Sequence, residues 1–369
     1  MKIKNLLFLP LLLSTIALSS CNEKQEKINL LYGQQIKNDV TYIDYQEVKE
    51  KFLKRETFII SVFANNCRCW TDLHSILKQY ISNYHVEVFA ISYNDFLLAS
   101  KSNDNNVFKL NIASGSTTFA VVENGELRFN ELNTEKTKTL RSYNAFEEFM
   151  NELVILPKMF YIDLDQLNQL FETDKTSLVY FSRSNCSDCL YFDEHFLRNY
   201  QMTKNMYILD CESIGIREYD AEGNLTPESA TKWQEFKDNY YLSNVNNKDF
   251  GYDTGYVPTL LLFNGDSTTK KPTFISGAVY FNDELVKENG EYIVKNSYYS
   301  NERKNKLTYL DNVENKVLEG IKIDENNITL YGEYIAWKKI DASKYHDPLM
   351  KAFLDDANNK INHDKFLEE

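Results

Sequence analysis

The chain has 369 residues, of which 43% are hydrophobic and 14% aromatic, and it contains only 12 glycines and 6 prolines. This composition excludes a disordered or low-complexity protein and supplies enough apolar material for two domains with buried cores. The formal net charge is -13, and it falls to about -15 if a leader carrying Lys2 and Lys4 is removed, so nucleic acids are not expected as partners.

The N-terminus has the pattern of a secretory signal. Lys2 and Lys4 precede an apolar run over residues 6–18, which is too short to cross a membrane as a helix. Two serines and Cys21 follow, and this sequence resembles the bacterial lipobox, in which the cysteine carries the lipid. We expect a signal peptide at 1–20, a lipid anchor on Cys21, a tether over 21–39, and a location on the extracytoplasmic face of the cell membrane. The alternative is an ordinary signal peptide followed by a chance cysteine.

The first half of the chain alternates between predicted strands and helices. Apolar strands are expected at 57–63 and 86–91, and apolar residues recur at helical spacing from 73 to 81. Short strands at 119–122 and 127–129 flank Asn124-Gly125, which is typical of a hairpin turn. A last helix is predicted at 143–153.

Two cysteines follow the strand at 57–63 with one residue between them, as Cys67-Arg68-Cys69. A disulfide at this spacing closes a very small ring, so we expect it to be strained and more oxidising if it forms. Two free thiols are an alternative, and a metal site lacks further ligands because His74 and His85 have no convergent partner. Two roles stay open, a degenerate site kept for packing or binding and an auxiliary redox pair.

A second pair of cysteines follows a predicted apolar strand that begins at Ser177. Cys186 and Cys189 stand at the start of a predicted helix, and their spacing places both sulfurs within one helical turn. Backbone N–H groups at a helix N-terminus favour a thiolate over a thiol, and the second sulfur can then resolve a mixed disulfide. An inert disulfide and a zinc site are the alternatives.

Further strands are predicted at 206–209, at 259–263 directly after Val257-Pro258, and at 274–281. The order of strand, CxxC, helix, strand and Val-Pro-Thr strand resembles the thioredoxin family, in which a cis-proline packs beside the cysteine pair. Two positions depart from the family pattern, since Asn185 replaces an aromatic residue and Tyr180 replaces a buried acid.

The resemblance implies the roles of the site residues. Cys186 is the attacking thiolate, Cys189 is the resolving thiol, and Val257, Pro258 and Thr259 shape a groove for an extended substrate. The resemblance also implies that no metal ion or organic cofactor takes part.

The first half of the chain follows the same order, with Thr117 near the place of the proline. We therefore predict an α/β protein with two tandem thioredoxin-like domains, each a mixed sheet flanked by helices. A degenerate domain covers 40–156, and a second domain covers 157–369, enlarged by insertions at about 211–255 and 282–344.

Several features lie outside the minimal domain. The first insertion has a predicted helix at 228–241 with an aromatic face, for which a role in covering the core is favoured over peptide binding. The second has a predicted strand at 292–294 and a tyrosine-rich stretch at 298–309, and Asp347-Pro348 is expected to open the closing helix. Cys211 is either a buried small residue or a third exchange partner.

These patterns together predict a membrane-anchored, extracytoplasmic thiol-disulfide oxidoreductase that acts on protein or peptide thiols and disulfides through Cys186 and Cys189. The direction of the reaction stays open. The alternative is a non-enzymatic binding or adapter lipoprotein of the cell envelope, because a fold does not fix a function.

Overall fold

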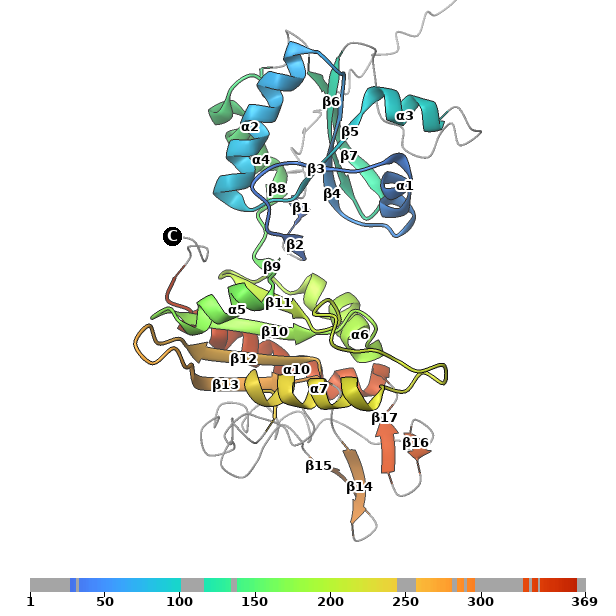
Figure 1. Cartoon of the computed structure of the whole chain (residues 1–369), viewed down its shortest axis with the longest axis vertical. Coiled ribbons are helices and arrows are strands. Elements are labelled where there is room, and N and C mark those ends of the chain that lie inside the picture. The colour runs from blue at the N-terminus through green and yellow to red at the C-terminus, as the bar shows by residue number, and fades with distance from the viewer. Residues whose placement is uncertain are drawn as a thin grey trace, which may run out of the picture.

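The computed structural model describes residues 27–30, 33–100, 116–133, 138–243, 257–280, 284–288, 291–295, 328–331, 334–337 and 339–363. The predicted lipidation site at Cys21 and the tyrosine-rich stretch at 298–309 lie outside these residues. Two mixed sheets with helices packed against them make up most of the described chain (Figure 1).

The first sheet has five strands in the order β3-β5-β4-β6-β7. The first three are mutually parallel, and β6 and β7 are antiparallel to their neighbours. The strands are β3 (Thr41–Tyr42), β4 (Phe58–Phe63), β5 (Val88–Ser92), β6 (Thr117–Glu123) and β7 (Glu126–Asn133), and the helices are α1 (Tyr45–Leu53), α2 (Arg68–Tyr84), α3 (Tyr93–Ser100) and α4 (Tyr143–Leu153).

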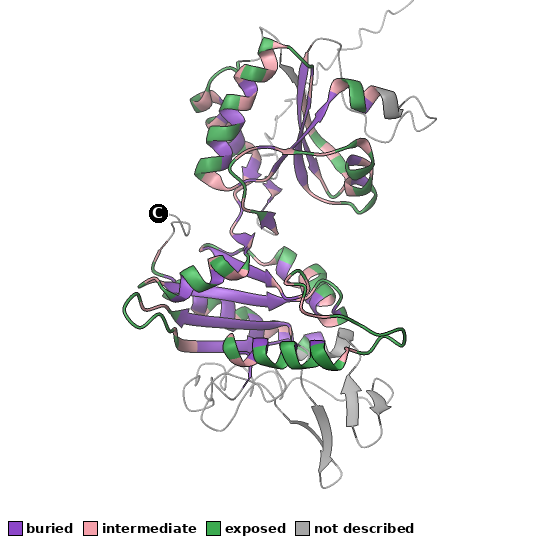
Figure 2. Ribbon diagram, in the orientation of Figure 1, coloured by how far each residue is buried: buried purple, intermediate pink, exposed green. Residues whose placement is uncertain are grey.

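The central strand β4 is buried on both faces, which explains why it is apolar except for Ser61 (Figure 2). Side chains alternate between the faces, so Phe58 and Ile60 pack with α1 and α3 while Ile59 packs with α2 and α4. The predicted helix at 143–153 is confirmed. The hairpin is also confirmed, and Asn124 and Gly125 have φ angles of 52° and 74°, as a tight hairpin turn requires.

The second sheet has six strands in the order β13-β12-β10-β11-β9-β2. Its strands are β2 (Gln34–Gln35), β9 (Met159–Tyr161), β10 (Thr176–Ser182), β11 (Met206–Asp210), β12 (Thr259–Asn264) and β13 (Thr273–Val279). Its helices are α5 (Leu164–Phe171), α6 (Ser187–His195), the 3-10 turn η1 (Leu197–Asn199), α7 (Pro227–Asn239) and α10 (Lys339–Lys360). A separate sheet of order β15-β14-β17-β16 is built from β14 (Glu284–Glu288), β15 (Glu291–Lys295), β16 (Ile328–Tyr331) and β17 (Tyr334–Trp337).

The two large sheets share one topology. Apart from the added edge strand β2, the order β9-β11-β10-β12-β13 repeats β3-β5-β4-β6-β7, with the same parallel and antiparallel neighbours. The prediction of an α/β protein with two tandem thioredoxin-like domains is therefore confirmed. The additions to the second domain contain α7 and the strands β14–β17.

The aromatic face of α7 covers the core, as favoured from the sequence. Trp233 and Phe236 are buried in the second core, and Tyr240 and Tyr241 pack against it. The helix covers 227–239, so its predicted end at 241 was two residues too late.

The closing helix begins earlier than predicted. Asp347-Pro348 was expected to open it, but α10 starts at Lys339 and contains the proline. Ser343 and His346 are buried, and this packing holds helical turns ahead of the proline. Asp347 does not cap the helix. Its carboxylate accepts a hydrogen bond from the Tyr280 hydroxyl and lies 3.0 Å from His195 Nε2.

The predicted tether at 21–39 is partly folded. Strand β1 (Ile28–Asn29) pairs in parallel with β8 (Val154–Ile155), and β2 pairs with β9 at the edge of the second sheet. Ile28 is fully buried in the first core, and Gln34 Oε1 accepts a hydrogen bond from Glu87 N–H at 2.9 Å. This segment therefore contributes a strand to each half of the protein. The two pairings are too short to give a strand signal in the sequence.

None of the helices in the described part of the chain is both long and apolar enough to cross a bilayer.

The folded segment at 28–35 makes a distinctive stability prediction. We expect Ile28→Ala to lower the free energy of unfolding of the first domain by about 2–4 kcal/mol, because it leaves a cavity in the core. Lys37→Ala, at an exposed site in the same predicted tether, should cost less than about 0.5 kcal/mol. Hydrogen exchange of peptides from β4 and β5, measured by mass spectrometry, checks both values. Equal, small effects would show that the segment acts only as a tether.

Candidate functional site

The loop that presents Cys186 is held by backbone hydrogen bonds and one carboxylate. It leaves the buried strand β10 at Ser182, and Cys186 N–H donates to the carbonyl of Arg183 at 3.0 Å. Asp210, at the end of the adjacent strand β11, accepts hydrogen bonds from the backbone N–H groups of Ser184 and Glu212, both at 3.0 Å. Asp210 therefore fixes the cysteine loop to the neighbouring strand.

Cys186 is the N-cap residue of α6. Its sulfur accepts a hydrogen bond from Cys189 N–H at 3.4 Å and lies 3.7 Å from the carbonyl oxygen of Val257. Cys186 is 8% exposed, whereas Cys189 is fully buried, and both carry free thiols. Both cysteines are thus largely buried, and of the two only Cys186 keeps any exposed surface.

The two thiols differ in acidity. The hydrogen bond from the Cys189 thiol lowers the pKa of Cys186 to about 6, together with backbone N–H groups of Cys189 and Asp188 and the charge of Arg183, while burial opposes the shift. Burial raises the pKa of Cys189 far above its usual value, with further contributions from Cys186 and Asp193. At neutral pH, the site therefore holds a thiolate at Cys186 and a thiol at Cys189.

Of the predicted groove residues, Val257 and Pro258 form the peptide beside Cys186, whereas Thr259 belongs to the sheet. The Val257–Pro258 peptide bond is cis, and the Val257 carbonyl faces Cys186. Thr259 is fully buried as the first residue of β12, where it pairs with Phe181 and Val279. The Thr259 side chain has no exposed surface, so this structure does not support the prediction that it lines the groove.

Cys211 is buried behind the cysteine loop. Its N–H donates to the Ser182 carbonyl at 2.8 Å, and burial raises the pKa of its thiol. The structure favours the interpretation of Cys211 as a buried small residue over a third exchange partner.

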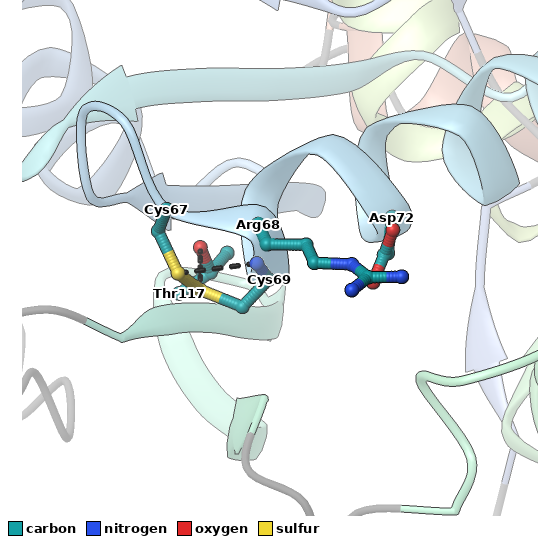
Figure 3. The surroundings of a disulfide bond; sticks show 5 residues. All are labelled: Cys67, Arg68, Cys69, Asp72 and Thr117. Carbon is teal, nitrogen blue, oxygen red and sulfur yellow. Dashed lines mark hydrogen bonds and ion pairs between the residues drawn. A yellow bond between two sulfur atoms is a disulfide. The ribbon is translucent and has the colours of Figure 1, made fainter.

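The cysteines of the first domain occupy the equivalent place. Cys67 is the N-cap residue of α2, its sulfur accepts a hydrogen bond from Cys69 N–H at 3.1 Å, and the two cysteines form a disulfide (Figure 3). Cys69 Sγ also lies 3.4 Å from Thr117 Oγ1.

The strand register shows that Thr117 stands where the second domain has its proline. Val62, the penultimate residue of β4, pairs with Thr118, and Phe181, the penultimate residue of β10, pairs with Thr259. The residues before these partners are Thr117 and Pro258. The predicted correspondence between them is confirmed.

The cysteine pair of the first domain lies at the end of α2 that is far from the second sheet. Helix α2 has 17 residues and is therefore about 25 Å long. Its C-cap residue His85 contacts Phe160 of the second sheet, with ring centroids 6.1 Å apart, whereas Cys67 lies at the opposite end (Figure 1).

The described ranges contain no group of three or more His, Cys, Asp or Glu side chains suited to hold a metal ion. His74, considered as a ligand from the sequence, lies 2.6 Å from Asp39 through its Nε2 atom.

Sequence reasoning missed two residues next to the cysteine loop. Asp210 carried a usable signal, because it is a carboxylate directly after the strand predicted at 206–209. Tyr219 carried none. It lies in the first insertion, and its hydroxyl accepts hydrogen bonds from Asn185 Nδ2 at 3.3 Å and from Arg217 Nε at 3.0 Å.

No protein-family model matches the sequence, and no curated protein matches it. Among solved structures, the chain is similar to a mutant thioredoxin from Halobacterium salinarum, with 11% identity and a TM-score of 0.24, over 32% of this chain and 94% of that one. A Plasmodium falciparum thioredoxin has 18% identity and a TM-score of 0.23, over 31% and 98%. Full-length ERdj5 has 9% identity and a TM-score of 0.24, and the alignment covers 64% of this chain but only 30% of ERdj5. The strand order, rather than these similarities, identifies each domain as thioredoxin-like.

The pKa of Cys186 can be measured from the pH dependence of its alkylation rate. In the reduced protein, the rate of Cys186 modification by iodoacetamide should rise with a midpoint near pH 6, because the thiolate is the reacting form. Arg183→Gln should move this midpoint upward, since a stabilising charge is lost. Peptide mass spectrometry identifies the modified residue, with Cys186→Ser as the control. A midpoint near the ordinary value of about 8.5 contradicts the assignment.

Proposed function

We propose that the second domain is a thiol-disulfide oxidoreductase. The observation that carries this proposal is the difference between the two thiols: Cys186 keeps a small exposed surface and a lowered pKa, whereas Cys189 is fully buried with a raised pKa. Such a pair supplies both steps of disulfide exchange, because the first sulfur is ready to attack and the second is kept from competing until it is needed.

The reaction begins when the Cys186 thiolate attacks one sulfur of a substrate disulfide. The substrate S–S bond breaks, a mixed disulfide forms at Cys186, and the departing substrate sulfur leaves as a thiolate that takes a proton. Cys189 then loses its proton and attacks Cys186 Sγ, which releases the second substrate thiol. The substrate gains two electrons and two protons, and the protein keeps a Cys186–Cys189 disulfide. The reverse sequence oxidises a dithiol, and a dithiol or disulfide protein on the same side of the membrane restores the starting state.

The proposal includes a lipid anchor on Cys21 and a location on the extracytoplasmic face of the membrane. It is supported by the signal-like N-terminus and the small residues before Cys21. Seven residue steps separate Cys21 from the buried Ile28. A segment of this length reaches at most about 25 Å, so a lipid on Cys21 would hold the folded chain close to the bilayer.

The order of attack predicts which variant traps substrates. Cys189→Ser should accumulate mixed disulfides through Cys186, because attack proceeds and resolution does not. Cys186→Ser should trap nothing. The variant Cys67→Ser with Cys69→Ser is the matched control and should keep most dithiol turnover. Mass spectrometry of thiol-quenched membranes counts the adducts, and equal adducts from both single variants would reverse or remove the assigned roles.

The anchor is tested by one substitution at the predicted lipidation site. Cys21→Ser should release the protein from the membrane or leave an uncleaved precursor, which fractionation and intact mass can distinguish. Ser20→Thr, a change beside the cysteine that keeps the acceptor sulfur, serves as a control and should stay membrane-bound. A Cys21→Ser protein that is matured and membrane-bound like the parent would exclude the anchor.

A further inference from the structure

The first insertion builds a fixed wall beside the cysteine loop. Residues 217–226 double back through a bridge between Tyr219 and Leu225, and Glu218 N–H donates to Ser229 Oγ of α7 at 2.9 Å. Ile216 and Leu225 pack against the second core. The wall is thus held by both the core and α7.

Arg217 and Tyr219 join this wall to α7 and to the cysteine loop. Its guanidinium lies 4.8 Å from the ring centroid of Trp233 and 5.5 Å from that of Tyr219, and its Nε pairs with Glu212 at 3.4 Å. The Tyr219 hydroxyl accepts from Arg217 and also from Asn185, the residue directly before Cys186. Tyr219 is therefore held against the residue that precedes the attacking cysteine.

The surface near Cys186 is apolar at two points. Tyr219 is 41% exposed and Leu190, on the first turns of α6, is 48% exposed. Both belong to a set of only four large hydrophobic residues that are exposed in the described part of the chain, and the other two, Tyr42 and Leu53, lie in the first domain. Leu190 follows Cys186 by one helical turn and Tyr219 contacts Asn185, so each lies where a polypeptide that approaches Cys186 can contact it.

The exposed charges of the wall are all acidic. Glu218, Asp220 and Glu222 are exposed, whereas the only cation of this segment, Arg217, has a side chain that is 7% exposed and paired with Glu212. Asp220 accepts hydrogen bonds from the N–H groups of Glu222 and Asn224, which keeps the turn closed and its carboxylates together. A fixed acidic rim raises the local concentration of cationic partners.

From these contacts we propose that the wall at 217–226 selects the substrate of Cys186. The substrate class is a polypeptide cysteine, in a disulfide, that has an apolar residue nearby and Lys or Arg residues flanking it. Tyr219 packs against the apolar residue, and Glu218 and Glu222 attract the flanking cations. This inference rests on the proposed exchange activity of Cys186, and it adds the specificity of that activity.

The test uses short peptides whose single cysteine is linked to a thiopyridyl reporter. One peptide has Leu near the cysteine and Lys flanks, the second has Glu flanks, and the third has Ala in place of Leu. Hydroxyethyl disulfide is small and neutral, so it reports the reactivity of Cys186 with no contribution from contacts to the wall. We expect the Lys-flanked peptide to react about tenfold faster than the Glu-flanked one at low salt, with the ratio falling as salt screens the charges.

Two variants test whether Glu218, Glu222 and Tyr219 cause the preference between the peptides. Glu218→Gln with Glu222→Gln should bring the ratio of Lys-flanked to Glu-flanked rates close to one. Glu148→Gln with Glu152→Gln, which changes the net charge equally at exposed sites on α4, should leave the ratio unchanged. Tyr219→Ala should slow the Leu peptide about fivefold relative to the Ala peptide, since apolar contact area is lost, and should not slow hydroxyethyl disulfide.

The outcomes separate the inference from the activity on which it rests. Failure of the parent protein to react with hydroxyethyl disulfide overturns the proposed oxidoreductase and this specificity with it. Normal reaction with hydroxyethyl disulfide, together with equal rates for Lys-flanked and Glu-flanked peptides, overturns the specificity alone. An equal loss of preference in the α4 control variant would also overturn it, because net charge and not the wall would then be responsible.

Discussion

The chemistry of the second domain depends on where a buried strand ends. Strand β10 lies between β11 and β12, and its last residues place the following turn beside the ends of both neighbours. Asp210 from β11 holds the turn, and the Val257 carbonyl before β12 faces the sulfur that the turn presents. The helix that follows then supplies the N–H groups that favour a thiolate. One strand end therefore determines the position, the exposure and the acidity of Cys186.

The features predicted well from the sequence were those with a local physical signal. The apolar strands, the Asn124-Gly125 hairpin and the helix at 143–153 follow from periodicity and turn chemistry. The position of Cys186 at a helix start also follows, because a strand and a helical pattern flank it. The place of Thr117 beside Cys69 follows from the strand order, because the two halves of the chain have similar patterns.

The features that escaped prediction depend on contacts between distant segments. Strands β1 and β2 are two residues each, and they exist because β8 and β9 offer edges to pair with. The helix start at Lys339 depends on the burial of residues ahead of Pro348. The contact of Tyr219 with Asn185 joins an insertion to a loop 34 positions away. Patterns within one short window carry no information on these pairings.

The duplicated fold carries two sulfur pairs in unlike states. In the first domain the two sulfurs form a disulfide beside a threonine hydroxyl. In the second domain both cysteines carry free thiols, and Cys186 keeps a small exposed surface whereas Cys189 has none. The length of α2 keeps the first pair at the far end from the second sheet. The strand pairings at 28–35 tie both halves to one N-terminal segment, so a membrane anchor ahead of that segment would place two sulfur sites at the same surface.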